Sequence, residues 1–450
     1  MTAWDVCVLG GGPAGSVCAL RLARLGHRVV LVERRPFPRP HVGEALSPGV
    51  PALLDVLGLR HALDGSVPSG GALVRWEDDT TRQVEPDPRA VTVDRGRFDH
   101  VLLAAARAEG VAVRQPARAG RPRRGPDGWE VPLRHDVLRA RFLVDASGRH
   151  RATGGTTTAT GARTLALHAV WPGTGPTRIG AGPRTWCWGA PLPDGAFRAM
   201  AFVDPDLLRH YAYDVRRLYH HLLDTTGLFA DRPASLDVAV CDATSYRDDD
   251  PVTEDRVKVG EAAYTLDPLT SSGVDSAVQS AMAAAVTANT VLSGGDRAAA
   301  LAFYRDRRDR AAARHAAWTA AHYHRHETHR DQPFWRRRAV PPPARARPAP
   351  TPLTPDCLHR PVRLVADAAV VPTPCPVGDV VTLRRALTHP ALPGPVAHVG
   401  DTELAPLLDC LAHAPSLADL LRTWSARLPA GQAEATAKWL FGAGLLVVGG

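Results

Sequence analysis

Two apolar runs separated by a helical pattern open the chain. Val6–Leu9 and Val29–Val32 each read as a short buried strand, and apolar residues recur at helical spacing between Ala19 and Leu25. This pattern predicts a β-α-β unit, with a helix that connects two neighbouring strands of one sheet. We therefore expect the chain to belong to the α/β class.

The loop between the first strand and the helix carries glycines in the G-x-G-x-x-G spacing. Gly10 allows a tight turn, Gly12 lets the backbone approach a pyrophosphate, and Gly15 lets the helix pack close to the strand. The free N–H groups at the start of the helix would face the phosphates. Glu33 ends the second strand and can accept hydrogen bonds from ribose hydroxyls. The pattern predicts a dinucleotide site; a glycine-rich turn in an ordinary β-α-β unit is the alternative.

The middle of the chain alternates between extended and helical patterns. Residues 161–250 hold short extended segments and one predicted helix, Asp206–Leu223. A strand, a turn and an alanine-rich helix follow over 256–295, and a helix rich in arginine and histidine is predicted over 296–330. The predicted boundaries are a nucleotide-binding domain over 1–160 and 251–338 (with the first part of a substrate sheet near 66–94), a substrate domain over 161–250, a proline-rich linker over 339–356, and a module over 357–450.

The last part of the chain has its own amphipathic pattern. Leucines at 404, 407, 408 and 411 recur at i, i+3, i+4 and i+7, which predicts a helix. Ser416 is suited to cap a second helix that carries Leu417, Leu420, Leu421 and Trp424. A third helix is predicted over 432–441, followed by a short strand at Leu445–Val448. Three helices and a strand indicate a small winged-helix-like module.

Composition narrows the class of protein further. The 450-residue chain has a net charge of +8, and its seven cysteines are scattered without a C-x-x-C pair. This usage is typical of reduced thiols in a cytoplasmic protein and argues against a disulfide framework or a cysteine zinc site. We expect no membrane span, because no run of about 18 apolar residues occurs, and no signal peptide, because a strand begins almost at once. No motif indicates nucleic-acid binding.

Four more segments line up with the glycine loop. They are a glycine-bearing loop at His41–Gly49, an Arg-bearing helix at Asp94–Val111, a strand that ends in Asp145 (Arg141–His150), and a strand, proline turn and helix at Val257–Ala277. Their order and spacing resemble the superfamily of FAD-dependent monooxygenases and flavin-dependent halogenases, over residues 1–335. The resemblance implies a Rossmann-like FAD-binding domain of the glutathione-reductase and p-hydroxybenzoate-hydroxylase type, with an inserted β-sheet substrate domain.

The resemblance also implies which residues hold FAD. The ADP half would lie on the glycine loop and the end of the second strand, Arg95 and Asp145 would help to fix the cofactor, and the helix after Gly273 would point at the isoalloxazine ring. Glu261 stands where the family usually has aspartate. The implied cofactor residues are Gly10, Gly12, Pro13, Ala14, Gly15, Glu33, Arg34, Gly43, Arg95, Asp145, Gly260, Glu261, Pro268, Ser272, Gly273 and Val274.

One segment resembles the halogenase branch of the superfamily. Thr185–Leu192 is similar to the W-x-W-x-I-P signature and places Trp186 and Trp188 beside the substrate; packing of two same-face strand residues is the alternative. Halogenases deliver the halogen through a lysine, and here Leu73 or Val74 occupies that place. Thr270 stands where the tryptophan halogenases have a glutamate.

Without the lysine and the glutamate, the resemblance implies direct oxygen transfer from a flavin C4a-hydroperoxide to an electron-rich aromatic ring. Candidate bases are Glu44, Asp267 and His41, and the sequence does not choose among them. The reaction would use O2, with electrons from NAD(P)H or from a separate flavin reductase. A halogenase, an FAD-dependent reductase and a flavin-binding scaffold without turnover are the alternatives.

The substrate prediction rests on resemblance as well. Residues 39–59 look similar to the flavin monooxygenases that mature quinohemoprotein amine dehydrogenase, which oxidise a tryptophan side chain within another protein. The expected partner is therefore a protein or peptide substrate, gripped partly by the C-terminal module; a dimerisation or stabilising role for the module is the alternative.

A histidine cluster follows the long predicted helix. His322 and His326 are spaced i, i+4, and His329 follows three residues later, a spacing that could bind a metal. No carboxylate or cysteine cluster accompanies them, so we expect a solvated polar helix and no metal site.

Overall fold

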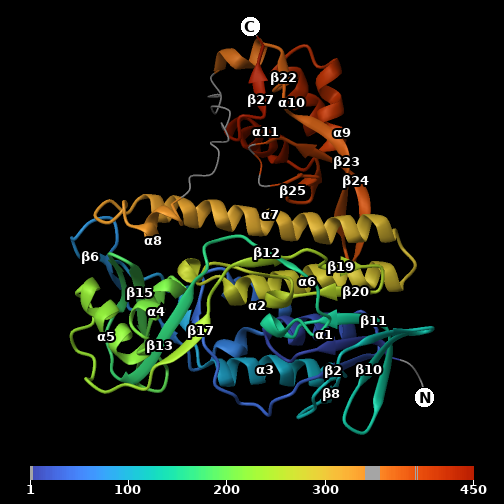
Figure 1. The fold of residues 1–450 in the computed structure, drawn as a ribbon. Helices are drawn as coiled ribbons and strands as arrows, with labels where there is room; N and C mark the ends of the chain where they lie inside the picture. Colours follow the sequence, from blue (N-terminus) through green and yellow to red (C-terminus); the bar gives the residue numbers. More distant parts are fainter. Residues whose placement is uncertain (1–3, 340–354, 391, 393, 450) are drawn as a thin grey trace. The chain divides into compact units, whose positions relative to one another are not determined.

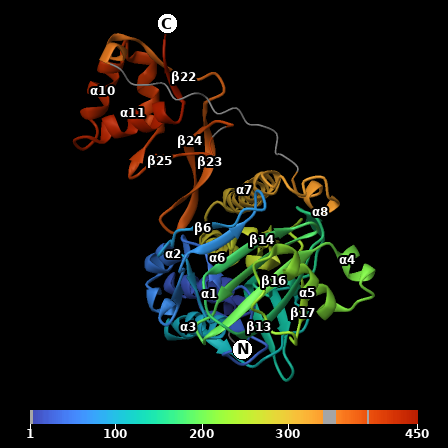
Figure 2. The same ribbon diagram turned by 90° about the vertical axis from the view of Figure 1, so that its left-hand side faces the viewer.

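The computed structural model describes residues 4–339, 355–390, 392 and 394–449. It divides into two compact units (Figures 1 and 2), one made of residues 1–297 and 304–342 and the other of residues 298–303 and 343–450. Most of the predicted proline-rich linker lies outside the described residues. Within the described part of the chain, no helix combines the length and apolar character that crossing a bilayer requires.

A largely parallel sheet forms the centre of the first unit (Figure 1), which confirms the predicted α/β class. Its main strand order is β19 (Val252–Thr253), β20 (Arg256–Lys258), β11 (Val137–Asp145), β1 (Trp4–Leu9), β2 (Val29–Val32) and β8 (Ala112–Arg114), and the hairpin of β9 (Arg123–Gly125) and β10 (Gly128–Pro132) continues from β11. In the parallel ladders Leu9 is level with Asp145 and Val32. The carboxyl ends of these strands therefore meet at one edge, where α/β folds bind ligands.

Closely packed helices cover this sheet. Helix α1 (Pro13–Arg24) contacts both α3 (Arg95–Ala108) and α6 (Gly273–Leu292). Small buried residues along α1 and α6, such as Ala19 and Ala284, let the helix axes approach each other. Further helices are α2 (Val50–Leu57) and α7 (Arg297–His324), and α8 (Pro333–Arg336) follows α7.

A second, seven-stranded sheet stands beside the first. Its order is β17 (Ala239–Asp242), β13 (Leu165–Pro172), β16 (Ala196–Val203), β15 (Thr185–Pro191), β14 (Thr177–Gly182), β5 (Ala72–Arg75) and β6 (Arg82–Val84). Strand β5, from the early part of the chain, pairs in parallel with β14. Two small sheets complete the unit: β12 (Thr157–Ala159) with β18 (Tyr246–Asp248) and β21 (Tyr264–Thr265), and β3 (Ala45–Leu46) with β7 (Val91–Thr92) and β4 (Val67–Pro68).

The helix predicted over Asp206–Leu223 is two helices. The first, α4, covers Pro205–His210, and the second, α5, covers Val215–Thr226. Between them Ala212 and Tyr213 have φ angles of 50° and 63°, which end the first helix. Asp214 then caps α5, because its side chain accepts from the Arg217 N–H at 3.0 Å.

The second unit contains the predicted helices and a long hairpin that the pattern did not predict. The hairpin pairs β23 (Ala369–Val377) with β24 (Val380–Thr388). Prolines at 372, 374 and 376 made β23 unrecognisable in the sequence. The hydrogen-bond ladder between β23 and β24 tolerates them because alternate residues of an edge strand point their backbone nitrogen away from the partner strand.

The predicted helices and final strand of this unit are present with adjusted bounds. The segment predicted from the leucines is α9 (Ala405–Leu408) and a 3-10 turn over Asp409–His413, and Ser416 caps α10 by accepting from the Asp419 N–H at 3.2 Å. The winged-helix assignment remains a prediction. The remaining elements are α10 (Leu417–Ser425), α11 (Gln432–Gly442), and the strand pairs β22 (Val362–Leu364) with β27 (Leu446–Val448) and β25 (His398–Val399) with β26 (Thr402–Glu403).

Candidate functional site

A cavity of about 910 Å³ opens at the carboxyl edge of the central sheet and runs to the second sheet. The glycine loop and the loops after β2, β11 and β20 line one end. Side chains of β15 and β16 line the other end, so the cavity joins the two predicted domains. Of the predicted cofactor residues, those on its wall are Gly10, Gly12, Pro13, Ala14, Glu33, Arg34, Gly43, Arg95, Gly260, Glu261, Pro268, Ser272, Gly273 and Val274.

The three glycines of the loop have different surroundings. Gly10 has a φ of 106°, and a Cβ there would lie 2.4 Å from the Ala146 carbonyl oxygen. A Cβ on Gly15 would lie 1.9 Å from the Gly10 carbonyl oxygen, so Gly15 serves packing and lies off the cavity wall. A Cβ on Gly12 would come no closer than 3.7 Å to its nearest neighbour, Arg39 Nη2. Gly12 therefore presents bare backbone to open space, as close approach of a pyrophosphate requires.

Glu33 is held at the end of β2 by two backbone donors. Its Oε2 accepts from the Gly11 N–H at 2.7 Å and its Oε1 accepts from the Arg35 N–H at 2.8 Å. The side chain is 5% exposed and faces the cavity. The carboxylate is thus fixed beside the glycine loop, where it can accept from ribose hydroxyls.

Arg95 fixes the loop that follows the second strand. Its guanidinium donates to the carbonyls of Val42 and Gly43, at 3.0 and 3.1 Å, and pairs with buried Asp99 at 3.0 Å. Arg39 also reaches Asp99, at 3.4 Å. Arg95 thus lines the cavity and at the same time holds this loop in place.

Asp145 orders a loop of the cavity wall and does not itself line the cavity. It is fully buried. Its Oδ1 accepts from the N–H and hydroxyl of Ser147, and its Oδ2 accepts from the N–H and hydroxyl of Thr153. Asp145 therefore orders the loop 146–154, and that loop supplies the cavity wall.

The loop before α6 forms the wall nearest the second sheet. Ser271 has a φ of 49°, and the next residues, Ser272 to Val274, open α6 against the cavity. Gly260 N–H donates to Ser280 Oγ at 2.9 Å, which ties the loop after β20 to the same helix. The N-terminal N–H groups of α6 thus face the cavity.

Aromatic side chains form the far end of the cavity. Trp186 and Trp188 lie on one face of β15, and both line the wall together with Met200 and Phe202 of β16. Trp186 stacks on Phe202 with ring centroids 4.0 Å apart. Aromatic and apolar side chains thus line this end, as an aromatic substrate would require.

The three candidate bases lie at different places. Glu44 is buried, pairs with Arg198 at 2.7 Å and accepts from the Gly43 N–H at 2.9 Å; burial raises its pKa, although Arg198 acts in the opposite direction. His41 is exposed, with Nδ1 2.6 Å from the Val42 carbonyl oxygen. Asp267 lines the cavity beside the aromatic end, and burial raises the pKa of its carboxyl.

Two side chains of α7 hold the loop that carries Asp267. The Tyr323 hydroxyl lies 3.0 and 3.2 Å from the two carboxylate oxygens of Asp267. His315 Nε2 lies 2.8 Å from the hydroxyl of Thr270. Tyr323 and His315 were not predicted, because they are 56 and 45 residues from their partners. No local pattern in the sequence pairs these two residues with the loop, so no signal was available.

The positions where halogenases carry their delivery groups hold uncharged residues. Leu73 and Val74 lie on β5, away from the cavity wall, and the Thr270 hydroxyl forms a hydrogen bond with His315. Lys258 is fully buried, lies off the wall and donates to Asp248 Oδ2 at 2.6 Å. Lys438, the other lysine of the chain, belongs to the second unit.

The histidine cluster is not the solvated helix face that the sequence predicted. Helix α7 ends at His324, so His326 and His329 leave the helical register. His326 is 2% exposed, stacks on Trp335 with centroids 3.8 Å apart, and contacts the Trp76 carbonyl oxygen through Nδ1. Among the residues that the structure describes, no group of three or more metal-ligating side chains is close enough to hold an ion.

The charge of the wall suits a dinucleotide with two phosphates. Eight arginines line the cavity, namely Arg34, Arg35, Arg39, Arg95, Arg118, Arg121, Arg149 and Arg151, against the carboxylates of Glu33, Glu44, Asp242, Glu261 and Asp267. The open backbone at Gly12, the fixed carboxylate of Glu33 and the excess of cations together fit FAD.

Comparison with known proteins agrees with this site. Residues 3–170 match the FAD binding domain family. A tryptophan 2-halogenase from Chondromyces crocatus is 30% identical over 333 residues, which are 66% of this chain and 64% of that protein, so the chain spans just under two thirds of its length.

Two solved structures resemble the whole chain. The peptidyl tryptophan dihydroxylase QhpG, essential for tryptophylquinone cofactor biogenesis, is similar with a TM-score of 0.79 and 27% identity, over 99% of this chain and 100% of that one. The flavin-dependent halogenase CmlS has the same TM-score at 22% identity, over 100% of this chain and 96% of that one, and this likeness concerns the fold.

Proposed function

Because the chain belongs to the superfamily of FAD-dependent monooxygenases and flavin-dependent halogenases, we propose that it hydroxylates an electron-rich aromatic ring. Reduced FAD, when bound, supplies the chemistry that activates O2. One oxygen atom enters the substrate and the other leaves as water, with two electrons from NAD(P)H or from a separate flavin reductase. The protein binds the ring, excludes water and moves a proton.

The observation that carries this proposal is the position of Lys258. A halogenase needs an amine that can reach the substrate, and Lys258 is the one lysine of the first unit. It is fully buried, and its ammonium donates to both Asp248 and the Gly154 carbonyl oxygen. An arginine cannot take over, because a guanidinium keeps its proton and is a poor nucleophile at neutral pH.

Asp267 is the proposed base. Glu44 is paired with the charged guanidinium of Arg198 at 2.7 Å, and His41 is exposed. The carboxylate of Asp267 accepts from neutral donors, the Leu269 N–H and the Tyr323 hydroxyl. Asp267 lies on the wall between the start of α6 and the aromatic end, and its raised pKa makes it a stronger base. It would accept the proton that the ring loses when aromaticity returns after oxygen transfer.

The aromatic end would bind and orient the ring. Trp186 stacks on Phe202, and Trp188 completes the same wall. These side chains would remove water from the reacting ring, which protects the oxidant from side reactions.

The proposed substrate is a tryptophan side chain of a protein or peptide, oxidised during maturation of a quinone cofactor. The support is the likeness to QhpG, which extends over both units of this chain. The second unit would grip part of the polypeptide substrate, which is a role that small appended modules can perform by adding a strand to their sheet.

Halogenation is the second candidate, and one observation favours it. Trp186 and Trp188 form a wall of the kind that the W-x-W signature implies, and a tryptophan halogenase is among the sequence relatives. A reductase of the same fold is a third candidate and would need no O2.

Mass spectrometry of the product separates these candidates. Proteins encoded beside this gene are incubated with the enzyme, FAD, a reductant and O2, with and without chloride and bromide, and in a matched anaerobic arm. We expect a gain of about 16 or 32 mass units on a tryptophan peptide, independent of halide and absent without O2. A halogen in the product contradicts the hydroxylase, and turnover in the anaerobic arm indicates a reductase.

A further inference from the structure

Lys258 and Asp248 form an ion pair in the interior of the first unit. Both side chains are fully buried, and Lys258 Nζ donates to Asp248 Oδ2 at 2.6 Å. Burial of two charges costs free energy that their attraction only partly returns, and well-packed apolar residues often replace such pairs without loss of stability. The pair therefore calls for an explanation other than stability.

The pair connects three separate segments of chain. Lys258 ends β20, Asp248 ends β18, and Lys258 also donates to the carbonyl oxygen of Gly154 at 2.7 Å. Gly154 belongs to the loop 146–155 that follows β11. Residues 146–152 and Gly154 of this loop lie on the cavity wall.

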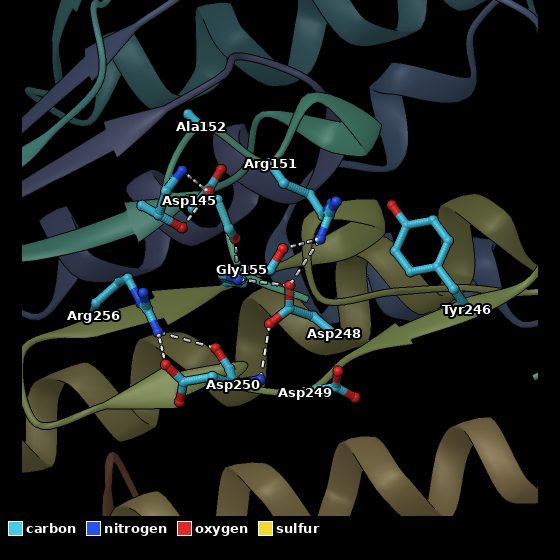
Figure 3. A network of polar contacts seen from close by, with 12 residues as sticks. Asp145, Arg151, Ala152, Gly155, Tyr246, Asp248, Asp249, Asp250 and Arg256 are labelled. Atoms are coloured by element: carbon cyan, nitrogen blue, oxygen red, sulfur yellow. Dashed lines mark hydrogen bonds and ion pairs between the residues drawn. The ribbon is translucent and has the colours of Figure 1, made fainter. Parts of the chain in front are cut away.

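Asp248 also reaches a cation on the cavity wall. Arg151 Nη1 lies 3.5 Å from Asp248 Oδ2 and donates to the Gly155 carbonyl oxygen at 3.0 Å, as Figure 3 shows. Arg151 has a φ of 46°, which is unfavourable for a residue with a side chain. The backbone is thus held in a strained conformation in which the guanidinium contacts Asp248 and the residue lines the cavity.

From this arrangement we propose that Lys258 and Asp248 are positioning residues for FAD. Lys258 holds the loop through the Gly154 carbonyl, and Asp248 holds Arg151, so that the loop 146–155 keeps the shape that the dinucleotide requires. Without the pair the loop would lose two anchors, and FAD would have to order it on binding. The inference concerns FAD binding and does not depend on which oxidation follows.

Affinity and stability can be measured separately on the full-length apoprotein. Lys258→Met leaves Asp248 buried without its ammonium partner, which should lower the melting temperature and weaken FAD binding. The double variant Lys258→Met, Asp248→Asn removes both charges, which should restore much of the melting temperature. If the pair positions the loop, FAD still binds on the order of tenfold more weakly to the double variant. FAD affinity is read from quenching of flavin fluorescence.

A nearby ion pair provides the matched control. Arg256, also on β20, donates to the Asp250 carbonyl oxygen at 3.0 Å and pairs with the Asp250 carboxylate, and neither residue lines the cavity (Figure 3). Arg256→Met should leave the FAD dissociation constant unchanged.

Where the Lys258 variants fold, either of two results would overturn the proposal. One is a double variant that binds FAD like the parent protein, which would reduce the pair to a structural role. The other is an equal loss of affinity in Arg256→Met. Should the Lys258 variants not fold, Arg151→Met leaves the ion pair in place, and parent-like FAD affinity in that variant also overturns the proposal.

Discussion

The hydroxyl of Tyr323 lies 3.0 Å from Oδ2 and 3.2 Å from Oδ1 of Asp267, so one residue of α7 orients the carboxylate on the cavity wall. Tyr323 is 2% exposed and packs against Trp76 and Trp335. The orientation of Asp267 is therefore set by a buried aromatic cluster, while Asp267 itself lines the cavity.

Asp267→Asn should lower kcat about 100-fold, because an amide cannot accept the proton that the ring loses. FAD binding should change little, since the variant keeps the size and polarity of the side chain. Steady-state kinetics and the flavin spectrum together check this. Asp275→Asn, on α6 but off the cavity wall, is the control. A parent-like kcat in Asp267→Asn would remove Asp267 from the mechanism.

The rate should rise with pH as Asp267 loses its proton. Burial raises the pKa of this carboxyl above its ordinary value of 3.8, and the hydrogen bond from Tyr323 lowers it in part. The base works only when deprotonated, so kcat climbs through the raised pKa and levels off above it. Tyr323→Phe removes the hydrogen bond, which should raise the pKa of Asp267 further and move the rising part of the kcat profile to higher pH. If the rising part of the kcat profile lies at the same pH in Tyr323→Phe and in the parent protein, Asp267 is not the base.

Alanine substitutions at two glycines of the loop should affect two different properties, the stability of the apoprotein at Gly15 and the affinity for FAD at Gly12. A Cβ at Gly15 would overlap the Gly10 carbonyl oxygen at 1.9 Å, so Gly15→Ala should destabilise the apoprotein by about 3 kcal/mol or more. A Cβ at Gly12 meets nothing closer than 3.7 Å, so Gly12→Ala should leave apoprotein stability within about 0.5 kcal/mol yet weaken FAD binding. Denaturant unfolding and flavin titration check both. Unchanged FAD affinity in Gly12→Ala would refute the role of its open backbone.

His315 should make the protein less stable as the solution becomes acidic. Burial lowers the pKa of His315 to about 4 from an ordinary 6.5. Above pH 6.5 the imidazole is neutral in the folded and the unfolded protein, so His315 causes no loss of stability there. Between pH 6.5 and 4 the unfolded protein takes up the proton first, so the free energy of unfolding falls as the solution becomes more acidic. Between pH 6.5 and 4, His315→Gln should reduce the loss in the free energy of unfolding by on the order of 2 kcal/mol.

Melting curves between pH 7 and 4 compare this variant with His324→Gln, which changes an exposed histidine at the end of the same helix. Equal slopes in His315→Gln, His324→Gln and the parent protein would show that His315 is not the group involved.

Removal of the Ser416 cap should weaken the second unit alone. Ser416 Oγ accepts from the Asp419 N–H at 3.2 Å and donates to Asp419 Oδ2 at 2.6 Å. Ser416→Ala should therefore cost about 1 kcal/mol in the unfolding of this unit, with FAD affinity unchanged. Ser425→Ala, the same change at an exposed site in the same helix, is the control. A loss of FAD affinity in Ser416→Ala would contradict this independence.

The sequence by itself predicted the features that depend on neighbouring residues. Strand, glycine loop and helix follow one another at Val6–Arg24, and the apolar period and the glycine spacing are local signals. The same holds for the cap at Ser416, which needs only the helix that follows it. These signals were enough for the α/β class and for most of the cavity wall at the carboxyl edge of the sheet.

The tertiary structure decided what depends on residues far apart in the chain. Asp145 was predicted to help to fix the cofactor, and only the structure shows that its carboxylate accepts from Ser147 and Thr153. His326 was predicted on a solvated face, but it is buried against Trp335. Asp267 could be separated from Glu44 and His41 only when the partners of each were known, because burial and hydrogen bonding, which no local pattern encodes, set the basicity of a carboxylate.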